Sequence, residues 1–95
     1  MAHRDDLEDY IKDRERREPG FAALVEAAES RRRFAKKLAE ARRRKHLSQT
    51  LVAARMGTSQ SMVHRVESGL DVRLSTIEKY AAALGGVIDM KLKSA

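Results

Sequence analysis

The chain has 95 residues, a net charge of +6, 36% charged residues and only 4% aromatic residues. This length allows one small domain with at most an added arm, and it leaves little room for a deep catalytic cleft. Because cysteine is absent, disulfides, thiolate catalysis and cysteine-based zinc sites are excluded. No apolar run approaches the ~18–20 residues of a membrane span, which predicts a soluble protein.

Charge is divided unevenly along the chain. Residues 1–30 hold nine acids and five bases, a net charge of −4, whereas residues 31–95 hold fifteen bases and five acids, a net charge of +10. An acidic arm on a basic body indicates two surfaces with two kinds of partner. A basic surface that serves solubility alone is the alternative. We divide the chain into an arm (residues 1–29), a helical domain (residues 30–86) and a tail (residues 87–95).

The arm is predicted to begin with a helix over residues 3–17. Leu7, Tyr10 and Ile11 recur there at helical spacing, and acids cluster near its start, where they favour a helix N-terminus. The apolar stripe is thin, so the helix is weak on its own. A Pro-Gly pair then breaks the pattern.

A second helical region is predicted over residues 21–45. Leu24 and Val25 share one face of it, whereas Leu38 lies on a rotated stripe beyond three consecutive arginines. The pattern fits either two helices that meet near Ser30 or one long helix.

Two short helices follow, each with its own start signal. Ser48 is suitable as the N-cap of a helix over residues 49–56, which Gly57 closes. Ser59 is suitable as the N-cap of a helix over residues 60–67.

A last helix is predicted over residues 74–84, followed by a strand. In residues 87–93, Ile88, Met90 and Leu92 alternate with charged residues, which is the period of a strand. Because a lone strand needs a mate, we expect the same strand of a second copy to pair with it in a homodimer. A frayed tail is the alternative.

Residues 47–69 read LSQTLVAARMGTSQSMVHRVESG. They combine two short helices, a glycine turn and the small Ala53 where the helices must approach closely. Together with Leu84-Gly85, which ends the last predicted helix, this stretch resembles the helix-turn-helix of the phage Cro and repressor proteins, the XRE family. The resemblance covers about half the chain. It implies an all-α, Cro/repressor-like helix-turn-helix bundle, to which we add the N-terminal helical arm and the C-terminal strand.

In such a domain the second helix lies in the DNA major groove, with its first residues at base edges. Glutamine pairs with adenine and arginine with guanine, and each contact provides about 1–3 kcal/mol of discrimination. The expected base contacts, on the face opposite the apolar one, are Gln60, Ser61, His64 and Arg65. The expected phosphate contacts are Gln49, Ser59, Ser68, Arg43, Arg44, Lys45 and Arg55. An ordinary solvated basic surface is the alternative.

The resemblance also implies an ion pair. In the family, an arginine seven residues before the glutamine that starts the first helix pairs with an acid at the end of the second helix. The matching residues here are Arg42 and Glu67. We expect this pair to be structural rather than to contact DNA.

Within the XRE family, the chain resembles HigA-type antitoxins, which bind operator DNA and a RelE/HigB-like ribonuclease toxin. An acidic arm suits the basic surface expected of an enzyme that cleaves RNA. The expected toxin contacts are Leu7, Tyr10, Ile11, Phe21, Leu24 and Val25. An arm packed on its own domain or on the dimer mate is the alternative.

Catalytic, metal and cofactor sites are not predicted. The three histidines lack metal-binding spacing, and no glycine-rich phosphate loop is present. We therefore expect no enzyme and no cofactor, but a cytoplasmic, nucleoid-associated bacterial antitoxin that represses its own operon. The alternatives are a stand-alone phage-type repressor and an adaptor that does not bind DNA.

Overall fold

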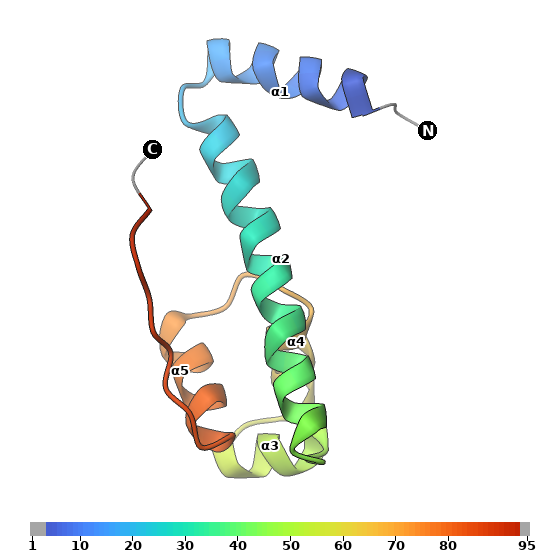
Figure 1. Ribbon diagram of the computed structural model, residues 1–95, viewed down its shortest axis with the longest axis vertical. Helices are drawn as coiled ribbons and strands as arrows, with labels where there is room; N and C mark the ends of the chain where they lie inside the picture. The colour runs from blue at the N-terminus through green and yellow to red at the C-terminus, as the bar shows by residue number, and fades with distance from the viewer. Residues whose placement is uncertain (1–3, 94–95) are drawn as a thin grey trace. The chain divides into compact units, whose positions relative to one another are not determined.

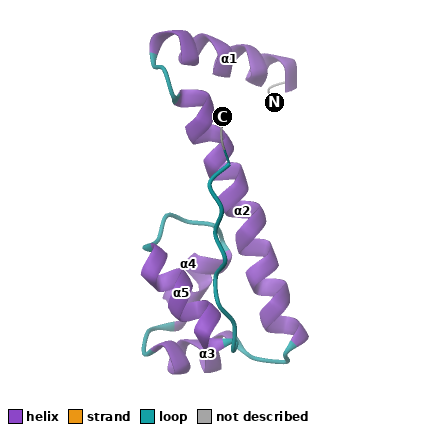
Figure 2. Ribbon diagram, turned by 60° about the vertical axis from the view of Figure 1, so that its left-hand side comes forward, coloured by secondary structure: helices purple, strands orange, loops and turns teal. Residues whose placement is uncertain are grey.

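The computed structural model describes residues 4–93, and every regular element in this range is a helix (Figures 1 and 2). The helices are α1 (Arg4–Arg17), α2 (Phe21–Arg44), α3 (Gln49–Met56), α4 (Gln60–Glu67) and α5 (Leu74–Ala83). The predicted helical bundle is therefore confirmed. Within the described residues, no helix is long and apolar enough to cross a membrane.

Helix α2 resolves the two alternatives left by the sequence, because it runs through Ser30 without interruption. The chain nevertheless divides into two compact units between Arg31 and Arg32. The first unit holds α1 and the start of α2. The second unit holds the remainder of α2 together with α3, α4 and α5.

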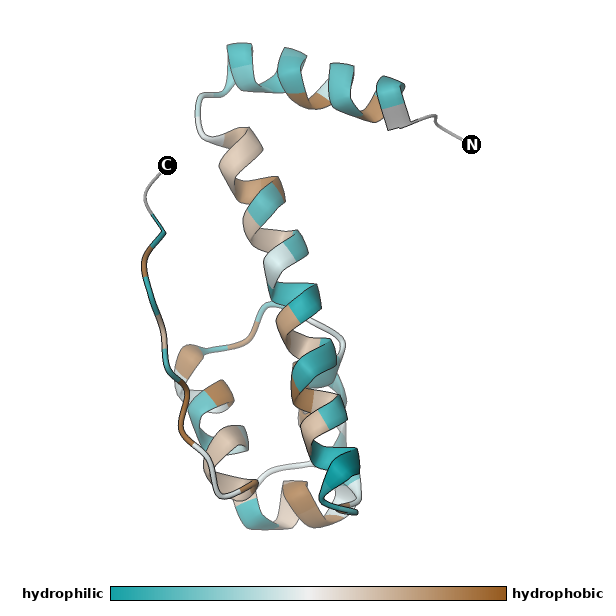
Figure 3. Ribbon diagram, viewed as in Figure 1, coloured by the Kyte–Doolittle hydropathy of each residue, from teal (hydrophilic) through white to brown (hydrophobic). Residues whose placement is uncertain are grey.

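In the first unit, α1 is largely hydrophilic with isolated apolar positions (Figure 3). His3, which was expected in this helix, lies outside the described residues. The turn after α1 is closed by Glu15, whose carboxylate accepts hydrogen bonds from the backbone N–H groups of Gly20 (3.0 Å) and Ala22 (2.7 Å). Glu15 thus satisfies donors at the start of α2 that have no partner within the helix.

The core of the second unit is small and aliphatic, with one tyrosine. Val52, Val63 and Tyr80 are fully buried there, one from each of α3, α4 and α5. Leu38 supplies the contribution of α2 to this cluster. Helix α3 contacts α4, and its Ala53 is a small residue buried in the same cluster.

The ends of the short helices follow the predicted signals. The Ser48 side chain accepts a hydrogen bond from the backbone N–H of Leu51 (3.0 Å), and that of Ser59 accepts one from Met62 (3.2 Å). Gly57 ends α3 with a φ of 69°, in the left-handed region that favours glycine. These local signals fix where α3 ends and α4 begins.

The predicted C-terminal strand was wrong. Residues 87–93 form no strand, and nothing in the structure supports pairing of this segment in a dimer. Ile88 packs against the core of its own unit, whereas Met90 and Leu92 are 58% and 98% exposed. The physical reason is that a strand needs backbone partners, and the described part of the chain offers no strand edge.

Candidate nucleic-acid interface

Helix α4 has one buried side and one exposed side. Val63 and Val66 are 0% and 3% exposed, and they turn the opposite side of the helix toward solvent. Ser61, His64 and Arg65 lie exposed on that opposite side. The helix-turn-helix therefore presents short polar side chains and an arginine from a rigidly packed helix.

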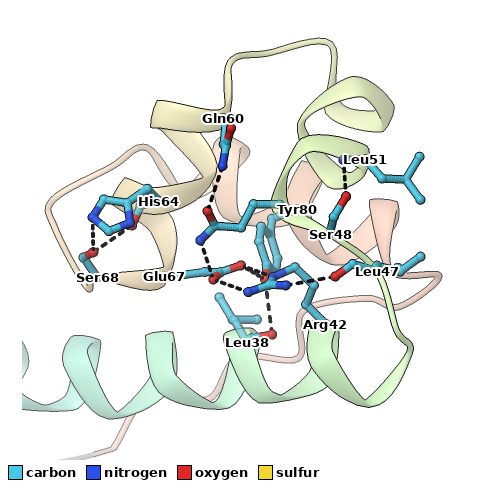
Figure 4. A network of polar contacts seen from close by, with 11 residues as sticks. Leu38, Arg42, Leu47, Ser48, Leu51, Gln60, His64, Glu67, Ser68 and Tyr80 are labelled. Atoms are coloured by element: carbon cyan, nitrogen blue, oxygen red, sulfur yellow. Dashed lines mark hydrogen bonds and ion pairs between the residues drawn. The ribbon is translucent and has the colours of Figure 1, made fainter.

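Gln60 stands beside α3 at the start of α4. Its Nε2 donates a hydrogen bond to Oε1 of Gln49 (3.3 Å), and Nε2 of Gln49 donates to Oε1 of Glu67 (3.1 Å). Figure 4 shows this chain of contacts from Gln60 to the interior of the unit. The two glutamines, which begin α3 and α4, are thus linked to each other and, through Gln49, to the carboxylate of Glu67.

The four predicted base contacts lie together. Gln60, Ser61, His64 and Arg65 line one shallow hollow of about 480 Å³, and Gln49 completes its wall. Amide groups, a hydroxyl and a guanidinium around one hollow can match both donors and acceptors of base edges.

One neighbouring cation was missed by the sequence analysis. Arg73 and Thr76 line a second hollow of about 600 Å³, and Arg65 lines both hollows. Arg73 is the exposed N-cap of α5 and makes no side-chain capping hydrogen bond. Arg73 was not among the predicted DNA contacts, because no local signal in the sequence shows that the start of α5 lies beside α4.

The structure places Arg42 and Glu67 in direct contact, as the resemblance implies. Nε of Arg42 donates to one carboxylate oxygen of Glu67 at 2.7 Å, and Nη2 donates to the other at 3.0 Å (Figure 4). The hydroxyl of Tyr80 contacts the same carboxylate at 2.6 Å and the backbone oxygen of Leu38 at 3.2 Å. This cluster joins three helices around one ion pair whose side chains are largely shielded from solvent.

The cluster shifts the pKa values of its members. Burial raises the pKa of Glu67, but hydrogen bonds from Arg42, Tyr80 and Gln49 outweigh that effect and lower it. Burial, with the neighbouring Glu67 carboxylate, raises the pKa of Tyr80 well above its ordinary value. At neutral pH the carboxylate is therefore charged and the phenol is neutral.

Several predicted phosphate contacts have other partners. Lys45 donates to the backbone oxygen of Leu84 (2.5 Å) and Arg55 to that of Ala83 (3.0 Å), so both cations satisfy carbonyls at the end of α5. The hydroxyl of Ser68 donates to the backbone oxygen of His64 (2.8 Å). The structure does not bring these three side chains into the hollow on α4.

Arg43 and Arg44 are exposed in the last turn of α2, and they too lie outside that hollow. Ser59, by contrast, caps α4 directly beside Gln60. Of the predicted phosphate contacts, Gln49 and Ser59 are therefore the two that the structure places next to the predicted base contacts.

In the first unit, two predicted toxin contacts touch each other. The rings of Tyr10 and Phe21 meet edge to face with centroids 6.2 Å apart, and the Arg14 guanidinium lies 4.6 Å from the Phe21 centroid. Leu7 and Leu24 are 52% and 71% exposed. The remaining two predicted toxin contacts, Ile11 and Val25, are half-buried.

Among residues 4–93, no group of three or more His, Asp or Glu side chains is placed to hold a metal ion.

Comparison with known proteins gives two results. The family model described as helix-turn-helix matches residues 38–87. The chain is also 38% identical over 90 residues to Antitoxin HigA1 of Mycobacterium tuberculosis, in strains CDC 1551 / Oshkosh and ATCC 25618 / H37Rv. These alignments cover 94% of this chain but 60% of each relative, so the chain spans less than two thirds of their length.

Proposed function

The chain belongs to the helix-turn-helix family, and from this premise we propose that it is a sequence-specific DNA-binding antitoxin. As a homodimer it binds operator DNA in the bacterial cytoplasm, represses its own operon and neutralises a RelE/HigB-like ribonuclease toxin. It is a regulator and not an enzyme. Similarity to two relatives that carry the name antitoxin supports this proposal. A stand-alone phage-type repressor is the alternative.

The observation that carries the DNA-binding proposal is the outward presentation of α4. Val63 and Val66 anchor the helix, and the hollow beside it gathers Gln60, Ser61 and Arg65. The major groove is wide enough to admit a helix with its first residues at base edges. We assign the contacts with DNA bases to the four predicted residues that line this hollow, and His64 is one of them.

Backbone phosphates are held beside the hollow. Gln49 and Ser59 stand at the N-termini of α3 and α4, where the free N–H groups favour an anion. Arg73 adds a cation beside Arg65. The other predicted phosphate contacts, more distant from the hollow, are Ser68, Arg43, Arg44, Lys45 and Arg55.

The DNA-binding proposal is tested by selecting a duplex from a random-sequence pool and measuring its affinity for the protein. We expect a palindromic site with half-sites about one helical turn apart. Arg65→Ala should weaken binding to the selected duplex by about 1–3 kcal/mol and weaken binding to random duplex less. Lys91→Ala, which removes a charge from the exposed tail, is the matched control and should leave the discrimination unchanged. Equal loss on both duplexes for Arg65→Ala would contradict base contact by this residue.

The toxin-binding proposal rests on the chemistry of the arm. The arm combines a net negative charge with exposed apolar anchors at Leu7 and Leu24. Tyr10, Phe21 and the half-buried side chains noted above complete the proposed contact surface. Such a surface suits a basic partner with apolar recesses.

Co-expression with a toxin encoded beside the gene tests the toxin-binding proposal. Deletion of residues 1–20, or Leu24→Asp, should abolish rescue from the toxin while DNA binding persists. Val87→Asp is the matched control, because Val87 is an apolar side chain that is 93% exposed in the tail. Rescue that survives both changes in the arm would favour the stand-alone repressor.

A further inference from the structure

Part of α2 carries a basic surface, of which only Arg44 belongs to the predicted phosphate contacts. We name it the outer face of α2, and it consists of Arg33, Lys36, Lys37, Glu40 and Arg44. All five side chains are exposed, whereas Ala35, Leu38 and Ala39 on the other side of the helix are buried. Four cations and one acid give a net charge of +3 over about 17 Å of helix.

The outer face of α2 and the hollow on α4 point in opposite directions. On α2, Leu38 and Arg42 face the other helices, because they contact Tyr80 and Glu67. In Figure 4, Gln60 lies at the end of α4 that is farther from α2, whereas Glu67, at the other end, contacts Arg42 of α2. The two surfaces therefore lie on different sides of the unit. We expect that a straight duplex seated on α4 does not reach the outer face of α2.

We propose that the outer face of α2 is a second nucleic-acid surface, which holds the backbone of another duplex segment while α4 occupies the operator. The stripe of cations runs along one helix, and duplex DNA presents one negative charge per ~1.7 Å of its axis. Several phosphates can therefore lie along the stripe at once. We expect binding there to be independent of base sequence, because cations along one face of a helix neutralise phosphates.

The composition of the face favours a nucleic acid over an acidic protein. Protein interfaces need apolar or aromatic anchors, and lysine is depleted from them. The outer face of α2 has no such anchor among its five residues. Within the described residues, no ion pair joins Lys36, Lys37 or Arg44 to an acid of this chain. These three cations are thus available for phosphates at no cost in internal contacts.

Two surfaces on opposite sides allow one protein to touch two DNA segments. The protein can then pass directly from one segment to another during its search for the operator, or join two segments once it is bound. The second contact is electrostatic, so it weakens steeply with salt. Loss of Lys36 and Lys37 should reduce the slope of log affinity against log salt by about 1.8 for the second duplex only.

The test uses the full chain bound to an immobilised copy of the selected duplex, with a labelled random-sequence duplex added in solution. We expect capture of the labelled duplex at low salt. The double variant Lys36→Gln, Lys37→Gln should lower that capture several-fold, while its affinity for the selected duplex stays within about twofold. Because both side chains are exposed, the melting temperature should not change.

A second double variant provides a control of equal charge. Lys91→Gln, Lys93→Gln removes two exposed cations elsewhere and should leave capture intact. Equal loss of capture by both double variants, or loss of affinity for the selected duplex in the first, would overturn the proposal. Capture of polyglutamate in place of random duplex would overturn it in favour of an acidic protein partner.

The inference rests on the proposed function, because α4 must hold the first duplex. If the protein selects no duplex from the random pool, the proposed function and this inference both fail. If it selects a duplex but captures no second one, only this inference fails.

Discussion

Arg42 and Glu67 form a bidentate pair that joins α2 to the last residue of α4. The nitrogen–oxygen distances are 2.7 and 3.0 Å, and the two side chains are only 11% and 6% exposed. Tyr80 and Gln49 donate to the same carboxylate, so the buried charge is compensated on both oxygens. The position of α4, and with it the hollow that we assign to DNA, depends on this pair.

Removing one partner of the pair should cost more than removing both. Arg42→Met leaves a buried carboxylate without its counter-ion and should destabilise the fold by about 3–5 kcal/mol. The double variant Arg42→Met, Glu67→Met should recover part of that loss, because no charge is then left buried. Urea unfolding of Arg42→Met, Glu67→Met and the double variant measures the cost of each substitution and the coupling between the two residues. Strictly additive costs would contradict a coupled pair.

The free energy of unfolding should fall at acid pH, because Glu67 becomes protonated there. Hydrogen bonds, chiefly from Arg42, hold the pKa of Glu67 in the fold below its ordinary value of 4.5. A lowered pKa contributes stability above the ordinary value, and this contribution is lost as pH falls through the folded pKa. The free energy of unfolding of the native chain, measured relative to that of the double variant, should therefore fall below about pH 4.5. A difference that stays constant from neutral pH into that acid window would contradict this assignment.

Two glycines with the same backbone conformation should respond differently to alanine. Gly57 and Gly69 have φ of +69° and +73°, so alanine is strained at either position by about 1–2 kcal/mol. A Cβ at Gly57 meets nothing within 4 Å, whereas one at Gly69 would lie 2.8 Å from Cα of Arg32. Gly69→Ala should therefore lower the melting temperature clearly more than Gly57→Ala. Equal shifts would show that α2 yields at this contact.

The sequence predicted those features that are determined locally. The bounds of α3 and α4 follow from Ser48, Gly57 and Ser59, whose caps act within four residues of the chain. Three of the base-contact candidates on α4 could be predicted too, because helical periodicity places Ser61, His64 and Arg65 away from the side of Val63 and Val66.

Features that depend on contacts distant in sequence were missed. The alternation of Ile88, Met90 and Leu92 has the period of a strand, but the tail forms no strand and Ile88 packs on the core of its own unit. Likewise, charge alone does not show that Lys45 and Arg55 bind carbonyls at the end of α5. Such outcomes require the three-dimensional arrangement of the helices.

Glu15 should report on the order of the arm. Its pKa is lowered by hydrogen bonds from the backbone N–H groups of Ala22 and Gly20. The amide proton shifts of these two residues should therefore titrate together, with a midpoint below the ordinary glutamate value. Glu15→Gln should abolish this titration, and Glu18→Gln is the matched control that should retain it. Amides that titrate at the ordinary value would indicate that the turn after α1 is not held by Glu15.

A single change at Ser59 should separate stability from DNA binding. The Ser59 side chain caps α4 by accepting a hydrogen bond from the backbone N–H of Met62, and aspartate is an equally good N-cap that also suits the helix dipole. Ser59→Asp should therefore leave the melting temperature nearly unchanged. The added negative charge lies at the position proposed to face a phosphate, so affinity for the selected duplex should fall at least about tenfold. Ser48→Asp makes the same exchange at the cap of α3, beside Gln49, and should behave alike. Unchanged affinity in both variants would mean that the duplex approaches neither helix N-terminus, and the proposed phosphate contacts there would have to be abandoned.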